Sequence, residues 1–306
     1  MQIGIVGLGR MGGNMARRLA RGGIEVIGFD ANPASSAALA EEGVLGVAPS
    51  IVALAQRLAA PRVVWLMLPA GRVTELAVEE LWPELTRGDL IVDGGNANYK
   101  DSQRRGAALT TAGLRFVDCG VSGGVWGLDN GYALMFGGDD ASAAMIEPYA
   151  KILAPAPGAG WLHCGPCGAG HFVKMIHNGI EYGMMQAYAE GIALLKGKAE
   201  FGIDVAAVAE TWRHGSVVRS WLLDLVAQFL ERDANLAGIA PVVADSGEGR
   251  WSALEAIEQG IPAPVMSLAL MMRFASQGKS DYADKLLAMM RQGFGGHAVE
   301  QRDTKP

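Results

Sequence analysis

A glycine-rich turn near the start of the chain constrains the fold more than any other feature. Gly7-Leu8-Gly9-Arg10-Met11-Gly12 has the spacing G-x-G-x-x-G, follows an apolar, strand-like run at residues 2–6 and opens a helix-like run at residues 10–21. In this setting the first glycine permits a tight turn, the second lets a pyrophosphate approach the backbone, and the third lets the helix pack on the strand. We therefore expect residues 7–12 to bind a dinucleotide at the N-terminus of the helix.

The second strand-like run, Glu25–Phe29, is followed by an acidic residue. Asp30 is placed to hydrogen-bond the ribose hydroxyls of the adenosine, and its charge would repel the extra phosphate of NADP. No arginine follows at positions 31–34. NAD is therefore the expected cofactor, with NADP as the second choice. The simpler interpretation of Asp30 is a solvated carboxylate in a loop.

The first half of the chain alternates strand-like and helix-like runs. Further strands are predicted at Arg62–Leu68, Asp89–Val92 and Arg115–Cys119, and the first of these is nearly all apolar, as in a parallel strand covered on both faces. Strands that alternate with helices of about 10–15 residues predict βαβ units. The expected fold class is α/β, with an N-terminal doubly wound, Rossmann-type parallel sheet.

The pattern changes after a stretch rich in glycine and proline at residues 158–170. Beyond it strand signals are few, and helical stretches are predicted at Gly170–Gly197, Val205–Glu231, Trp251–Gln259 and Pro264–Gln292. We therefore expect an all-α C-terminal domain. At about 150 residues per domain, the 306 residues predict a dinucleotide-binding domain of residues 1–163 and a helical substrate and dimerisation domain of residues 164–306.

Composition excludes several classes of partner. The formal net charge is −6, so no large basic surface is available for nucleic acid, and an anionic substrate must be held by a local cluster of arginine and lysine. The N-terminus lacks the pattern of a signal peptide, and no apolar stretch reaches the roughly 18 residues of a membrane span. Three cysteines fit a reducing compartment. We expect a cytoplasmic protein that binds neither nucleic acid nor membrane.

A polar stripe runs along the helix predicted at residues 170–197. Lys174, His177, Asn178, Glu181 and Tyr182 follow the spacing i, i+3, i+4, i+7 and i+8, which places them on one face, while the residues between them are apolar or small. A surface helix has the reverse pattern, an apolar stripe on a polar helix. Because burying polar side chains is costly unless they are paired or meet a ligand, the stripe predicts a ligand site.

Two residues of this stripe could enclose a small substrate. Lys174 and Glu181 lie seven residues apart, which is about 10.5 Å along a helix axis. A small polar molecule would fit between them. The alternative is a solvated helix face that carries a lysine–glutamate pair.

The segment GHFVKMIHNGIEYG at residues 170–183 resembles the signature of the 6-phosphogluconate dehydrogenases. This helix motif is highly specific, whereas GVSGG at residues 120–124 is shared with the wider β-hydroxyacid dehydrogenase superfamily. Other stretches agree with the same family across nearly the whole chain: LMLPAG at 66–71, DGGN at 93–96, WRHGSVVRSWL at 212–222, GEGRW at 247–251 and RQGFGGH at 291–297.

The resemblance implies oxidative decarboxylation of 6-phosphogluconate to ribulose 5-phosphate and CO2, with reduction of NAD or NADP. Lys174 would be the general base that takes the proton of the substrate 3-hydroxyl. After the loss of CO2, Glu181 would protonate the remaining enediol as general acid. Lys174 must then be partly neutral near pH 7, which desolvation on an apolar helix near a cationic ring would favour.

The resemblance also implies binding residues. Arginine suits a phosphate because its planar fork matches the phosphate oxygens, and the N–H groups of a glycine turn suit a carboxylate. The implied ligands are Asn96, His177 and Asn178 for the sugar hydroxyls; Ser122, Gly123 and Gly124 for the carboxylate; Tyr182, Arg219, Arg250, Arg291 and His297 for the 6-phosphate; and Met67, Leu68, Pro69 and Asn96, with the glycine turn and Asp30, for the cofactor.

The chain departs from the longer members of this family. It lacks their duplicated helical unit and so resembles the short form, it has Arg250 where they have lysine, and its residues 125–130 differ from theirs. In relatives the C-terminal segment reaches into the active site of a neighbouring subunit. If this also holds here, Arg291 and His297 act in trans, and the expected assembly is a homodimer or homotetramer.

A dithiol motif, Cys164-Gly165-Pro166-Cys167, offers a different interpretation. It matches the motif of thioredoxin-like proteins, and with His163 and His171 it could suggest a zinc site. A thioredoxin motif belongs to a small fold of its own, however, and zinc would constrain the turn that leads into the catalytic helix. We therefore favour two thiols in a domain-linking turn, and expect no metal.

Two other functions remain open. A β-hydroxyacid dehydrogenase acting on 3-hydroxyisobutyrate or tartronate semialdehyde would share the first domain, GVSGG and Lys174. It would not need Glu181, Tyr182 or the three arginines, because its substrate has no phosphate. A nucleotide-sensing module without chemistry is a different class, and the intact pair of Lys174 and Glu181 argues against it.

Overall fold

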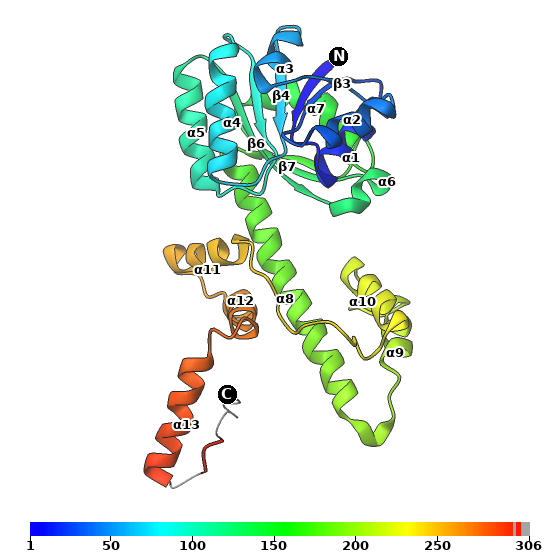
Figure 1. The fold of residues 1–306 in the computed structure, drawn as a ribbon, viewed down its shortest axis with the longest axis vertical. Helices are drawn as coiled ribbons and strands as arrows, with labels where there is room; N and C mark the ends of the chain where they lie inside the picture. Colours follow the sequence, from blue (N-terminus) through cyan, green and yellow to red (C-terminus); the bar gives the residue numbers. More distant parts are fainter. Residues whose placement is uncertain (296–297, 301–306) are drawn as a thin grey trace. The chain divides into compact units, whose positions relative to one another are not determined.

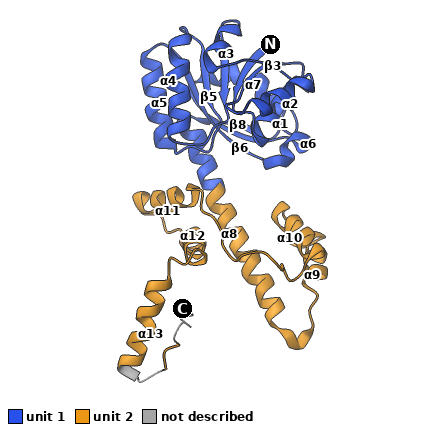
Figure 2. Ribbon diagram, in the orientation of Figure 1, with its two compact units in different colours: residues 1–177 blue, residues 178–306 orange. Residues whose placement is uncertain are grey.

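The computed structural model describes residues 1–295 and 298–300 of the 306-residue chain. It contains two compact units, residues 1–177 and residues 178–306 (Figure 2). The first unit is built on a sheet flanked by helices and the second is helical (Figure 1), so the expected fold class is confirmed. The domain boundary predicted at residue 163 stays a prediction.

Eight strands of the first unit form one sheet, in the order β3-β2-β1-β4-β5-β6-β7-β8. The chain runs from β1 outward to β3 and then returns to β4 on the other side of β1, which is the doubly wound arrangement. Val6 pairs with both Phe29 and Leu66, so the carboxyl ends of three strands lie at one edge. The strands are β1 Gln2–Val6, β2 Glu25–Phe29, β3 Gly46–Val47, β4 Val63–Leu66, β5 Leu90–Asp93, β6 Arg115–Ser122, β7 Ala133–Gly137 and β8 Trp161–Gly165.

The sheet is parallel except at one pair of strands. β7 runs antiparallel to β6, with Asp118 opposite Gly137 and Ser122 opposite Ala133. The connection between them, residues 123–132, is shorter than the dozen or more residues that a parallel crossover needs. The predicted parallel sheet therefore has one antiparallel pair, and β3, β7 and β8 are strands that the sequence patterns did not indicate.

Helices cover both faces of this sheet (Figure 1). In β4, Val63 and Trp65 belong to a core shared with α1 and α7, whereas Val64 and Leu66 belong to a second core shared with α3, α4 and α5. This two-sided burial explains why β4 is wholly apolar. The helices are α1 Arg10–Arg21, α2 Pro33–Glu41, α3 Ile51–Arg57, α4 Arg72–Leu81, α5 Tyr99–Thr111, α6 Gly127–Asn130 and α7 Asp140–Leu153, with short 3-10 turns η1 Trp82–Glu84 and η2 Gly124–Trp126.

The long helix α8, Ala169–Gly197, begins in the first unit and continues into the second. The stretch predicted at residues 205–231 is two helices, because Gly215 has φ +75° and Ser220 caps a new helix. The stretch predicted at 264–292 is also divided, near Gly278 with φ +73°. Such left-handed conformations favour glycine and end a helix. The remaining helices are η3 Ala199–Phe201, α9 Val205–Arg213, α10 Trp221–Arg232, α11 Glu248–Gln259, α12 Pro264–Ser276 and α13 Asp281–Gly295.

Two small cores of the second unit lie along α8. In one, Tyr188 packs with the buried residues Ala209 of α9 and Leu223 of α10. In the other, Tyr182 packs with Leu270 of α12. Among the residues that the structure describes, no helix is both long and apolar enough to cross a membrane.

Candidate active site

The glycine turn between β1 and α1 leaves an open helix N-terminus. Gly7 has φ +92°, and a Cβ there would lie 2.4 Å from the carbonyl oxygen of Met67, while a Cβ on Gly12 would lie 2.0 Å from that of Gly7. A Cβ on Gly9, by contrast, would find no heavy atom within 4 Å, and no side chain caps α1. Packing therefore excludes side chains at positions 7 and 12, and the open space at Gly9 fits the pyrophosphate of a dinucleotide.

Asp30 holds this turn against the end of β2. Its carboxylate accepts an N–H from Leu8 at 2.6 Å and another from Asn32 at 2.7 Å. The side chain is half-buried, so it remains accessible from solvent. Its negative charge lies beside the turn, where a ribose hydroxyl could donate to it and an added phosphate would be repelled.

The loops that follow β4 and β5 lie beside the glycine turn. Met67 N donates to Val6 O at 2.7 Å, and a Cβ on Gly95 would lie 2.5 Å from Leu68 O, so the two loops are in contact. They lie at the edge where the strand order reverses, which is where doubly wound folds bind ligands. This edge carries the predicted cofactor residues Met67, Leu68, Pro69 and Asn96.

Lys174 of α8 lies among polar groups of the first unit. Its Nζ is 3.5 Å from His177 Nδ1, and His177 Nε2 is 3.4 Å from Ser122 Oγ at the end of β6. Gly123 and Gly124 follow Ser122 with φ +133° and +54°, so a glycine turn continues from the hydroxyl. The structure thus brings together the predicted base, a predicted sugar ligand and the predicted carboxylate-binding turn.

A buried carboxylate that the sequence patterns did not single out fixes the start of α8. Asp118 Oδ1 accepts the N–H of Gly168 at 2.6 Å, and Oδ2 accepts that of His171 at 2.7 Å. Burial raises the pKa of Asp118, although the neighbouring His171 and these N–H groups oppose that rise. The available signal in the sequence was a single acidic residue within the otherwise apolar stretch of residues 116–121. Because Asp118 binds the first turn of α8, it fixes the helix that presents Lys174.

Helix α8 has the reverse of a surface helix pattern. Lys174, Asn178 and Tyr182 are buried, whereas Val173 and Ile180 are exposed. The other two residues of the polar stripe, His177 and Glu181, are half-buried. The stripe is therefore not a fully solvated face. This burial argues against the alternative of a solvated helix face that carries a lysine–glutamate pair.

In the second unit, arginine and aromatic side chains gather around Tyr182. The guanidinium carbon of Arg273 lies 3.4 Å from the centroid of the Tyr182 ring, and that of Arg250 lies 4.4 Å from the Phe274 ring. A Cβ on Gly249 would lie 2.5 Å from Tyr182 Cε2, so this glycine of GEGRW lets α11 pack on the ring. The two guanidinium groups and their rings form a cluster around Tyr182, and the planar donors of an arginine match the oxygens of a phosphate.

The two arginines of this cluster have different partners. Arg250 Nε forms an ion pair with Asp245, and although burial raises the pKa of Asp245, the bond to Arg250 helps to lower it overall. Arg273 Nη1 instead donates to the carbonyl oxygen of Ala244 at 2.8 Å. Sequence analysis missed Arg273, for which the available signal was a single arginine in the apolar run VMSLALMMRFAS.

Other predicted phosphate ligands lie elsewhere in the second unit. Arg219 is exposed in the segment between α9 and α10, and Arg291 is exposed on α13. Among the described residues, no hydrogen bond, ion pair or ring contact joins either side chain to the cluster around Tyr182. His297 lies outside the described residues.

Cys164 and Cys167 are free thiols, the first near the end of β8 and the second in the turn that leads to α8. Burial raises the pKa of both, that of Cys167 to about 12. Thiols with raised pKa values are poor nucleophiles and poor metal ligands. In the described part of the chain, no group of three or more His, Cys, Asp or Glu side chains could hold a metal ion. These observations favour two structural thiols.

Comparison with known proteins identifies the family of this chain. The NAD-binding domain of 6-phosphogluconate dehydrogenase matches residues 2–161, and the C-terminal domain of the same enzyme matches residues 170–305. The chain belongs to the 6-phosphogluconate dehydrogenase family. It is 39% identical over 304 residues to the NAD(+)-dependent, decarboxylating 6-phosphogluconate dehydrogenase of Haloferax volcanii, covering 99% of this chain and 100% of that one.

Solved structures agree with this 6-phosphogluconate dehydrogenase family assignment. The Plasmodium falciparum 6-phosphogluconate dehydrogenase superposes with a TM-score of 0.84 at 26% identity, covering 100% of this chain and 67% of that one. A 3-hydroxyisobutyrate dehydrogenase of Salmonella typhimurium superposes with a TM-score of 0.77 at 25% identity, covering 91% and 95%. The expected family and the class of nicotinamide-dependent dehydrogenase are thereby confirmed, and the length agrees with a short form.

Proposed function

We propose that this chain oxidises and decarboxylates 6-phosphogluconate, with Lys174 as general base and Glu181 as general acid. The observation that carries the proposal is the inverted helix α8, which buries Lys174 and Tyr182 and exposes apolar residues. The Haloferax volcanii relative, which matches along its whole length, is named for this decarboxylating reaction.

The steps follow from the groups near Lys174. A bound nicotinamide cofactor, held by the glycine turn of residues 7–12 and Asp30, would supply the acceptor for the hydride from C3. Lys174, in its neutral form, takes the proton of the 3-hydroxyl, which leaves a ketone at C3. The protonated Lys174 then returns its proton to that ketone oxygen while C1 leaves as CO2, and the electron pair of the C1–C2 bond forms the C2=C3 double bond of an enediol. Glu181 protonates C2 while Lys174 takes back the proton of the C3 hydroxyl, which gives ribulose 5-phosphate.

The remaining residues bind and orient the substrate. His177, which lies between Lys174 and Ser122, holds a sugar hydroxyl, as do Asn96 and Asn178. The turn of Ser122, Gly123 and Gly124 receives the carboxylate through backbone N–H groups. The phosphate is bound by Tyr182, Arg250 and Arg273, which lie in one cluster of the second unit. Arg291 and His297 would reach it from a neighbouring subunit, and Arg219, which lies outside this cluster, is included only because of the family resemblance.

NAD is the proposed cofactor, in preference to NADP. Asp30 already accepts two backbone N–H groups and can accept ribose hydroxyls as well. The 2′-phosphate of NADP would add a negative charge beside this carboxylate, and no arginine at positions 31–34 would balance it.

The active assembly is a homodimer or homotetramer. Helices α12 and α13 expose apolar side chains along their length, including Val265, Leu268, Tyr282 and Leu287. Apolar faces of this kind mark protein interfaces, and a second copy of the chain would cover them. Arg291 lies on the same exposed helix and would complete the phosphate site of the neighbouring subunit.

Initial-rate kinetics with 6-phosphogluconate test the reaction. Reduced nicotinamide and CO2 would be measured together, with gluconate and 3-hydroxyisobutyrate as control substrates. We expect one CO2 per reduced nicotinamide, and a loss of kcat on the order of 10³-fold in Lys174→Met. Oxidation of 3-hydroxyisobutyrate without turnover of 6-phosphogluconate would establish the competing β-hydroxyacid dehydrogenase instead.

Mixing two impaired variants, assayed at a 6-phosphogluconate concentration too low for Arg291→Ala to turn over appreciably, tests the shared site. Lys174→Met and Arg291→Ala would be purified separately, mixed, and allowed to exchange subunits. If Arg291 acts in trans, mixed assemblies contain some sites with both native residues, and activity returns. No recovery, despite exchange shown by differently tagged subunits, would place Arg291 in the site of its own chain.

A further inference from the structure

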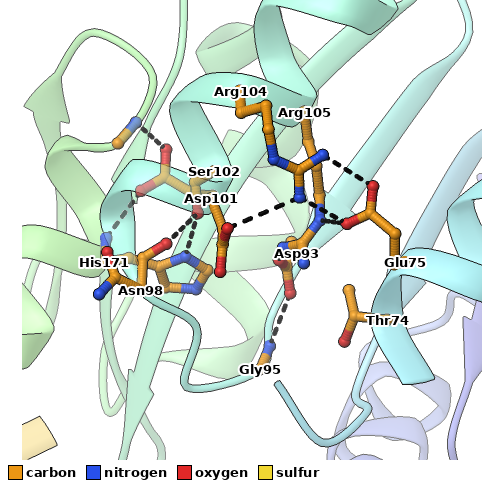
Figure 3. A network of polar contacts seen from close by, with 12 residues as sticks. Thr74, Glu75, Asp93, Gly95, Asn98, Asp101, Ser102, Arg104, Arg105 and His171 are labelled. Carbon is orange, nitrogen blue, oxygen red and sulfur yellow. Dashed lines mark hydrogen bonds and ion pairs between the residues drawn. The ribbon is translucent and has the colours of Figure 1, made fainter. Parts of the chain in front are cut away.

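A buried ion pair links β5 to α5 in the first unit. Arg105 Nη1 lies 3.0 Å from Asp93 Oδ2, and the two side chains are only 2% and 1% exposed. The Nε of the same arginine lies 2.8 Å from Glu75 Oε2 on α4 (Figure 3). One guanidinium therefore joins a strand and two helices, and none of these three residues is among the proposed ligands of cofactor or substrate.

One end of this link holds the loop that carries Asn96. The second carboxylate oxygen of Asp93 accepts the N–H of Gly95 at 3.2 Å (Figure 3). Asp93 ends β5 and Arg105 lies on α5, so the pair closes the loop between these elements from both sides. Asn96, the exposed residue of this loop, is thereby held in place by the residue before it.

The other end holds the loop of residues 67–69. Glu75 lies in the first turn of α4, and its neighbour Thr74 donates its hydroxyl to Pro69 O at 2.8 Å. The two loops meet where Gly95 lies against the carbonyl oxygen of Leu68. A fixed distance between α4 and α5 thus sets the spacing of both loops.

We infer that Arg105 is a positioning residue of the cofactor site, which sets the spacing between the loop of residues 67–69 and the loop of Asn96. This inference rests on the proposed cofactor role of these loops. Stability alone is a weak reason for such a pair, because a buried ion pair is often no more stabilising than apolar side chains of similar volume. A planar guanidinium, however, fixes the directions of two carboxylates at once, which an apolar side chain or a lysine does not.

The test compares variants of the full-length protein. Arg105→Met alone would leave the Asp93 charge buried and unpaired, which is strongly destabilising. The main variant is therefore Asp93→Asn with Arg105→Met, which buries no charge and keeps a side-chain oxygen for the N–H of Gly95. Arg105→Lys is the conservative variant. The matched control is Arg104→Met, since Arg104 binds the same Glu75 but its side chain is 57% exposed.

The readouts are the Kd for NADH, measured by nucleotide fluorescence without any sugar, and the midpoint of urea unfolding. We expect the double variant to bind NADH about ten-fold more weakly at a nearly unchanged midpoint, because small displacements of positioned groups are costly. The Kd of Arg105→Lys for NADH should lie between those of the double variant and the native protein. The Kd of Arg104→Met should lie within about two-fold of the native value.

Two results would overturn the inference. The first is a native affinity for NADH in the folded double variant, or in Arg105→Lys if the double variant does not fold. The second is a loss of NADH affinity in Arg104→Met that equals the loss in the double variant. Because NADH binding is measured without substrate, failure of this inference is distinguishable from failure of the proposed reaction. If the native protein binds NADH but does not oxidise 6-phosphogluconate, only the proposed reaction is contradicted.

Discussion

Lys174 lies directly against the backbone of Gly120. A Cβ atom at position 120 would lie 2.2 Å from Lys174 Cβ and 2.8 Å from its Cγ, and 3.2 Å from the carbonyl oxygen of Gly170. Contacts below 3.0 Å cannot be accommodated without movement, and here the nearest atom is close to the helix backbone. The proposed base can therefore hold this position only because residue 120 of β6 is a glycine.

Gly120→Ala should displace Lys174 and lower kcat by on the order of 10²-fold, because a shift of about 1 Å in a catalytic group can have this effect. NADH affinity should change little, since the glycine turn of residues 7–12 is untouched. The matched control is Gly158→Ala, where a Cβ would meet no atom within 4 Å. Native kcat in a folded Gly120→Ala protein would contradict this placement of the base.

The stacking of Arg273 on Tyr182 predicts a role in phosphate recognition. Arg273→Met keeps an unbranched side chain over the ring but removes the charge and its donors. We expect KM for 6-phosphogluconate to rise by on the order of 10-fold or more, in line with the loss of a charge-assisted hydrogen bond. Tyr182→Phe should have a smaller effect, because the ring remains. An unchanged KM for the phosphorylated substrate would remove Arg273 from the site.

Asp30 predicts the choice between the two nicotinamide cofactors. Asp30→Asn combined with Ala31→Arg removes the repelling carboxylate, adds a phosphate-binding cation, and keeps a side-chain oxygen for the N–H of Leu8. We expect the ratio of kcat/KM for NADP over NAD to rise by on the order of 10²-fold. Ala31→Arg alone serves as the control for the added charge. A native protein that already prefers NADP would contradict the role given to Asp30.

Glu75 predicts a pH-dependent part of the stability. The hydrogen bond from Arg104, followed by that from Arg105, lowers the pKa of Glu75 to about 2. A carboxylate with a lowered pKa binds fewer protons when folded, so its stabilisation is complete above the ordinary value of 4.5 and is lost as the pH falls toward 2.

Urea unfolding of the native protein and Glu75→Gln at several pH values measures this effect. We expect a difference on the order of 1–2 kcal/mol at pH 7, reduced by solvent screening of a partly exposed carboxylate. The difference should shrink steadily below pH 4.5. A difference that is the same at pH 7 and pH 3 would show that the charge of Glu75 does not contribute.

Local patterns determined the cofactor turn and the helical stripe of this protein. A tight turn between strand and helix requires glycine at fixed positions, so Gly7 and Gly12 are visible in the spacing alone. A helix repeats every 3.6 residues, so the positions of Lys174 and Tyr182 on one face follow from counting along the chain. Both features depend on residues close together in sequence, which is why the sequence could predict them.

Tertiary structure alone decided which distant residues meet. Asp118 binds the start of α8 from a strand some 50 positions earlier, and Arg105 connects Asp93 to Glu75 across three elements. Arg273 meets Tyr182 because α12 packs on α8, a contact that the spacing of arginines along the chain does not encode. The physical reason is that turns and helix periodicity are set by neighbouring residues, whereas the partner of a buried charge is set by the packing of whole elements.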